Sequence, residues 1–178
     1  MPMTGVPRRT PRADAAKRPR IDLLVEAGDW PARIELRRLA SRAIGAVAAQ
    51  PGAGIPADAE VSLVFTDDAH IRGLNHRFRG KDKATNVLSF PAATQAIGLG
   101  RFLGDIVLAR ETILSEAGDQ GLFPDDHLIH LIVHGFLHLL GFDHENDAEA
   151  GVMERLETAI LMRIGVADPY PGGDDGDP

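Results

Sequence analysis

The segment from Pro124 to His144 constrains the fold of this chain more than any other stretch. Pro124 and the two aspartates that follow it are typical of a helix N-terminus, and a strongly apolar run follows them. The apolar residues continue to Leu140, and Gly141 is typical of a residue that ends a helix. The sequence therefore predicts an apolar helix from Pro124 to Leu140.

Three histidines in this segment indicate a metal site. His134 and His138 are four residues apart, so they project from one helix face and both rings can reach one ion. Gly141 allows a left-handed backbone and a chain reversal, after which His144 can return as a third ligand. Three neutral imidazoles leave a divalent ion with an open position for water, as in catalytic rather than structural zinc sites. We predict one zinc ion per chain on His134, His138 and His144.

Other histidines offer alternatives. His130 and His134 are also four residues apart, so His130 is a competing ligand, but only the later three histidines bracket a chain reversal. The plainer interpretation of a histidine on an apolar helix is a buried or solvated side chain with hydrogen-bond partners. We favour that interpretation for His127, His130, His70 and His76.

The residue after His134 separates this motif from that of zinc proteases. The extended protease signature is His-Glu-x-x-His-x-x-Gly-x-x-His, and its glutamate is the general base. Position 135 is glycine in this chain. The sequence thus retains the metal geometry of that signature and lacks its proteolytic base.

The remaining periodicities predict an α+β domain with about four strands in a mixed sheet packed against helices. Strands are predicted at 21–26, 60–66, 87–90 and 102–109, and further helices at 30–49, 67–78 and 146–164. Asp67 or Asp68 is the expected cap of the helix at 67–78, and Asn146 with Glu149 resembles a capping box.

Length and composition predict one domain, at 21–168, in a chain of 178 residues. Residues 1–20 are proline-rich and basic and predict a disordered tail, and residues 169–178 predict a flexible acidic tail. The chain has no cysteine, which excludes disulfides and thiolate metal sites. No apolar run is long enough for a membrane helix or a signal peptide, so we expect a cytoplasmic protein without membrane contact.

The charge is unevenly distributed. The net charge is −7, which argues against a general nucleic-acid coat. Residues 72–83, however, hold five basic side chains and a single acidic one, Asp82. This basic island could attract an anion, although a solvated helix end gives the same pattern.

Three stretches of the chain carry distinctive motifs, which are LNHRFRGKDKATNVLSFP at 74–91, LGDIV at 103–107 and HGFLHLLGFDH at 134–144. Together they resemble the YbeY endoribonucleases, which are bacterial rRNA maturation factors. The region 154–170 is similar in character. Ala84 departs from the family, which usually has proline there, and the basic tail has no counterpart that we can place.

The resemblance implies a zincin-like fold and a zinc ion on His134, His138 and His144. It also implies cleavage of single-stranded RNA in 16S rRNA 3′-end maturation and ribosome quality control, so the expected partners are the 16S rRNA precursor and ribosome or small-subunit assembly proteins. Arg79, in the basic island, matches the family's functional arginine. A guanidinium there can neutralise charge on the reacting phosphate through paired hydrogen bonds.

Several roles stay open at this point. Asp105, Asp143 and Glu145 are candidates for the general base or for a partner of a ligand histidine. A second function is a non-catalytic assembly factor whose metal stabilises the fold, and a third, disfavoured by Gly135, is a metallopeptidase. The native metal is open as well, because imidazole also suits copper, nickel and iron.

Overall fold

The computed structural model describes residues 18–93, 101–142 and 147–170, which contain four strands and five helices. In chain order the elements are β1 (Arg20–Val25), α1 (Arg33–Ala48), β2 (Glu60–Thr66), α2 (Asp68–Arg79), β3 (Val87–Pro91), β4 (Phe102–Ala109), α3 (Arg110–Gln120), α4 (Pro124–Leu139) and α5 (Asp147–Arg163). The predicted α+β class is confirmed. None of the helices in these ranges has the length and apolar character needed to cross a membrane.

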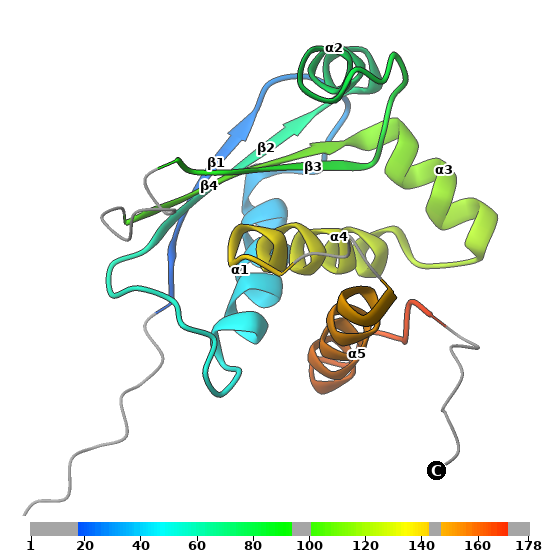
Figure 1. The fold of residues 1–178 in the computed structure, drawn as a ribbon. Coiled ribbons are helices and arrows are strands. Elements are labelled where there is room, and N and C mark those ends of the chain that lie inside the picture. The colour runs from blue at the N-terminus through cyan, green and yellow to red at the C-terminus, as the bar shows by residue number, and fades with distance from the viewer. Residues whose placement is uncertain (1–17, 94–100, 143–146, 171–178) are drawn as a thin grey trace, which may run out of the picture.

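The four strands form one mixed sheet in the order β1-β2-β4-β3 (Figure 1). β1 and β2 are parallel, as are β2 and β4, whereas β3 runs antiparallel to β4. β3 is therefore an edge strand. It ends at Pro91, a residue without an N–H donor that sheets accept at their edges.

Helices cover both faces of the sheet (Figure 1). α1 and α4 pack side by side on one face, α5 packs against α4 on the side away from the sheet, and α2 lies across the opposite face. The alternation predicted for β2 is present, since Val61, Leu63 and Phe65 are fully buried in the core shared with α1 and α4.

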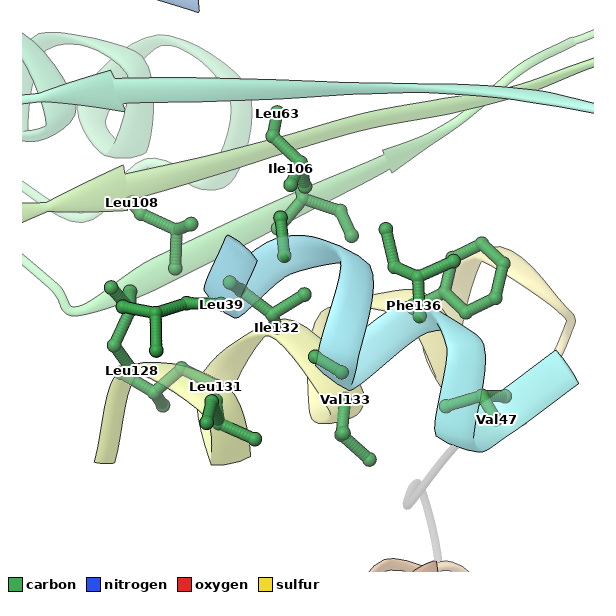
Figure 2. Packing of buried hydrophobic residues seen from close by; sticks show 14 of the residues in the cluster. Leu39, Val47, Leu63, Ile106, Leu108, Leu128, Leu131, Ile132, Val133 and Phe136 are labelled. Atoms are coloured by element: carbon green, nitrogen blue, oxygen red, sulfur yellow. The ribbon is translucent and has the colours of Figure 1, made fainter. Parts of the chain in front are cut away.

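The predicted apolar helix, α4, lies at the centre of this core (Figure 2). Ile132, Val133 and Phe136 are fully buried and pack among side chains from α1, β2 and β4. Burial of each such side chain contributes about 1.5–3 kcal/mol to folding. Packing on several sides fixes the rotation of α4 about its axis, which determines where its histidines point.

The helix α3 was not predicted from the sequence. It buries only Ile113 and Ala117, so it has no clear apolar stripe, and its N-cap residue, Ala109, offers no capping side chain. The missing cap comes from a distant part of the chain, because Asp68 accepts hydrogen bonds from the backbone N–H and the hydroxyl of Thr112. A long-range partner of this kind leaves no local sequence signal.

Other predicted signals are present where the structure describes them. The Asp67 side chain caps α2 by accepting a hydrogen bond from the His70 N–H. Gly141 has the positive φ, 91°, expected of a chain reversal after α4. The capping box at Asn146 lies outside the described residues, as do residues 1–17 and 171–178 of the predicted tails, which stay predictions.

Candidate metal centre

The structure brings two of the predicted ligands together on the last turns of α4. The Nε2 atoms of His134 and His138 lie 3.1 Å apart. Two imidazole nitrogens bound to one tetrahedral ion at the usual zinc distance would lie about 3.3 Å apart. The pair therefore has the spacing of two ligands of a single ion. His144 lies outside the described residues, so its position as third ligand stays a prediction.

A buried carboxylate from α5 contacts Nδ1 of His134, the ring nitrogen that is not the one close to His138. Glu157 is fully buried, and its Oε1 accepts a hydrogen bond of 2.7 Å from Nδ1 of His134. Its Oε2 lies 3.2 Å from Nε2 of His130 and accepts a 2.6 Å hydrogen bond from the Tyr170 hydroxyl. Three side chains thus converge on one carboxylate that has no contact with solvent.

These contacts keep the Glu157 carboxyl ionised. Burial raises its pKa, but the hydrogen bonds from His130, His134 and Tyr170 outweigh the burial and bring the pKa to about 2. An ionised carboxylate can only accept hydrogen bonds, so the Nδ1 of His134 carries the proton. A neutral His134 in this tautomer presents the lone pair of Nε2 toward His138, as a metal-binding histidine oriented by a carboxylate does.

Two groupings of these side chains can hold a metal ion. In the first, ligand atoms of His130, His134 and Glu157 lie within 4.8 Å of one another. In the second, the ion lies between the Nε2 atoms of His134 and His138, and Glu157 orients His134 from behind. The two groupings differ in the role of Glu157, which is a ligand in the first and a hydrogen-bond partner of His134 in the second.

A cavity of about 260 Å³ adjoins His134 between α4 and α5. Its lining residues are His134, Ala150, Met153, Glu154, Glu157 and Tyr170. Met153 is buried, as its place on the apolar stripe of α5 predicts. The cavity lies on the side of His134 that faces α5.

His127 belongs to a separate network, in line with the interpretation favoured from the sequence. It is 5% exposed, and its Nε2 lies 2.9 Å from an oxygen of Glu116 on α3. The same carboxylate accepts a hydrogen bond from the side-chain amide of Asn86, just before β3. This network joins α3, α4 and the start of β3, which places the edge strand beside α4.

Gly135 faces the sheet, not open space. A Cβ atom at this position would lie 2.9 Å from Cγ2 of Ile106 and 3.0 Å from Oγ of Ser89, and Ser89 donates a hydrogen bond to the Gly135 carbonyl. In zinc proteases this position carries the general base. Here Ile106 of β4 and Ser89 of β3 occupy the space that a side chain at position 135 would need.

We expect Gly135→Ala to lower the melting temperature. Alanine favours a helix by about 1 kcal/mol over glycine, but forcing a methyl group into packed surroundings costs about 1–3 kcal/mol. Thermal unfolding monitored by circular dichroism measures the balance. The matched control is Gly118→Ala in α3, where an added Cβ meets no atom within 4 Å, and which should raise the melting temperature. An equal rise in both variants would contradict this packing.

The predicted catalytic residue, Arg79, lies on the other side of the edge strand. It is the exposed last residue of α2, which covers the sheet face opposite α4. Within the described ranges Arg79 forms no ion pair, whereas Arg72 is held by Asp82 through hydrogen bonds of 2.7 and 3.0 Å. Arg79 thus keeps its charge available for an anion.

The acidic candidates differ in position. Asp105 lies on β4 directly opposite Phe90, and alternation along the strand places it on the α2 face with Val107 and Ala109. It is therefore not on the side of the sheet that carries the histidines. Asp143 and Glu145 lie outside the described residues.

Sequence reasoning missed Glu157 and Tyr170. A signal for Glu157 was present, because it interrupts the apolar spacing of α5 between Met153 and Leu161, where a charge is costly unless it is paired. Tyr170 carries no comparable local signal. Its contact with Glu157 depends on the chain after α5 turning back toward α4.

Comparison with known proteins extends these observations. Residues 27–165 match the family model described as Endoribonuclease YbeY. A protein named Endoribonuclease YbeY from Chelativorans sp. (strain BNC1) is 52% identical over 152 residues, which cover 84% of this chain and 92% of that protein. The protein of the same name from Rhizobium etli (strain CIAT 652) is 52% identical over 163 residues, covering 86% and 94%. A solution structure of a Thermotoga maritima protein has a similar fold, with a TM-score of 0.56 and 23% identity over 89% of this chain and 99% of that one.

Proposed function

Because the chain belongs to the YbeY endoribonuclease family, we propose that it is a zinc-dependent endoribonuclease that cleaves single-stranded RNA. The observation that carries the proposal is the histidine pair on α4, whose Nε2 atoms have the spacing of two ligands while Glu157 orients His134 from behind. Its proposed substrate in the cell is the 16S rRNA precursor during 3′-end maturation and ribosome quality control. The proposed setting is the cytoplasm, together with small-subunit assembly proteins.

The proposed ligands are His134, His138 and His144. We prefer them to the grouping of His130, His134 and Glu157 because the Glu157 carboxylate is fully buried and already accepts hydrogen bonds from three side chains. A carboxylate in that situation stabilises the orientation and tautomer of a ligand histidine. When bound, zinc would supply a Lewis acid for a phosphate oxygen or a water of lowered pKa.

The residues of the chain have separate tasks in this proposal. Glu157 holds the proton on Nδ1 of His134, so that Nε2 is the nitrogen that would bind the ion. Tyr170 and His130 hold Glu157 in turn. Arg79 binds the phosphate from the opposite side of β3, where its guanidinium offsets the charge that develops on the phosphate oxygens. Because Arg79 and the histidines lie on opposite sides of β3, an RNA that contacts both must pass over this edge strand.

The alternatives have less support. A metallopeptidase needs a general base at position 135, and that position is a glycine packed against Ile106 and Ser89. A non-catalytic assembly factor with a structural metal would leave the exposed charge of Arg79 without a role.

Cleavage of a single-stranded RNA with and without a chelator tests the proposal. We expect zinc removal to abolish cleavage while circular dichroism shows an intact fold, because the core of α4 does not depend on the ion. Restored zinc should restore cleavage. Unfolding on chelation would indicate a structural metal, and cleavage that survives chelation would contradict the proposal.

A further inference from the structure

The surface beside Arg79 carries an aromatic pair that the proposed chemistry does not use. We propose that Phe78 and Phe90 form a stacking platform for one base of the single-stranded RNA, next to the cleaved phosphate. This inference rests on the proposed function and deepens it, because it names the residues that hold the substrate on the α2 side of the edge strand.

The pair consists of one exposed and one half-buried ring. Phe78, near the end of α2, is 58% exposed, and its ring meets that of Phe90 on β3 edge to face, with centroids 5.2 Å apart. Phe90 packs against the small core under α2 and so is held in place. Phe78 is therefore in contact with Phe90 while much of its surface stays open to water, and a ligand that covered this surface would gain the free energy of apolar burial.

The charge around the pair favours a polyanion. The Arg77 guanidinium lies 5.2 Å from the centre of the Phe78 ring. Within the described residues, neither Arg77, Arg79, Lys81 nor Lys83 is in an ion pair. Opposing them beside Phe90 is the half-buried Asp105. Aromatic rings beside unpaired cations are the arrangement by which proteins bind single strands, the ring contacting a base and the cations the phosphates.

The platform and the helix that carries the histidines lie on opposite faces of the edge strand β3. Phe90 faces α2, whereas its neighbour Ser89 faces α4 and hydrogen-bonds the carbonyl of Gly135, the residue after His134. Adjacent residues of β3 thus contact the platform on one face and α4, the helix of the proposed ligands, on the other. A strand of RNA that crosses this edge can contact Arg79 and Phe78 on one side and the ion on the other.

The test is single-turnover cleavage by the zinc-loaded protein over a range of enzyme concentrations, with an RNA oligonucleotide that wild type cleaves at one site. Phe78→Ala should raise the half-saturating enzyme concentration on the order of ten- to a hundredfold, the usual effect of losing one base stack. The saturated rate should stay close to that of wild type. The matched control is Phe123→Ala, which removes an aromatic ring that is 78% exposed before α4 and should change neither quantity.

Two further variants separate stacking from packing. Phe78→Leu keeps an apolar contact with Phe90 but has no aromatic face, so it should bind RNA as weakly as Phe78→Ala. Phe78→Tyr keeps the ring and should bind like wild type. Wild-type binding by Phe78→Leu would overturn the inference, as would weakened binding by Phe123→Ala to the same degree.

Two further measurements, the salt dependence of binding and the affinity for an abasic RNA, distinguish a contact with a base from a contact with phosphates. Phe78→Ala should leave the dependence of affinity on salt concentration unchanged, whereas Lys81→Ala should reduce its slope by about 0.7. One abasic position in the RNA should cost wild type as much affinity as Phe78→Ala does, and should cost that variant nothing more. Unchanged binding of free RNA by Phe78→Ala would assign the ring to a protein partner and overturn the inference. Absence of cleavage by wild type would instead refute the proposed function.

Discussion

His138→Ala should lose most of the zinc that the wild-type protein retains through purification. The substitution removes one of the two nitrogens that lie 3.1 Å apart on α4 and leaves at most two of the proposed ligands. His138 is half-buried at the end of α4, outside the fully buried core, so the fold should persist. Metal content per chain, measured by inductively coupled plasma mass spectrometry after dialysis, checks the prediction against a wild-type value of about one.

His130→Ala is the matched control for this measurement. His130 lies on the same helix and contacts Glu157, but in the proposed arrangement it does not touch the ion. The variant should therefore keep most of its zinc. The reverse result, with zinc lost from His130→Ala and kept by His138→Ala, would place the ion among His130, His134 and Glu157 instead.

Arg79→Glu should retain zinc and fold but lose RNA cleavage by a factor on the order of a hundred or more. Loss of a group that stabilises charge in a transition state commonly has an effect of this size, and here the sign of the charge is also reversed. The side chain is exposed at the end of α2, so its replacement leaves the core untouched. Single-turnover cleavage at saturating enzyme, with metal content measured for each variant, gives the rate.

Two variants sharpen the interpretation of Arg79. Arg79→Lys should recover part of the rate, because an ammonium keeps the charge but cannot make two parallel hydrogen bonds to a phosphate. Arg37→Glu makes the same charge change at an exposed position on α1 and should have little effect. A wild-type saturated rate in Arg79→Glu, with only the affinity reduced, would limit Arg79 to docking the RNA.

Much of the fold was predictable because its elements have strong local periodicity. The four strands and four of the five described helices lie within a few residues of their predicted positions. The exception, α3, has a weak apolar stripe, and its cap is Asp68, the first residue of α2, which is 44 positions away from Thr112 in the sequence. Local patterns report side chains that share a face, whereas a cap from a distant residue appears only once the chain has folded.

The sequence by itself determined the pairing of His134 and His138, because residues four apart on a helix share a face whatever surrounds them. It also determined that position 135 cannot supply a carboxylate. Only the tertiary structure decided what lies behind His134, since the Glu157 carboxylate comes from another helix and its burial depends on α5 packing against α4. The tertiary structure likewise placed Arg79 across the edge strand from the histidines, because the side of a sheet on which a helix packs is a property of the whole chain and not of any local pattern.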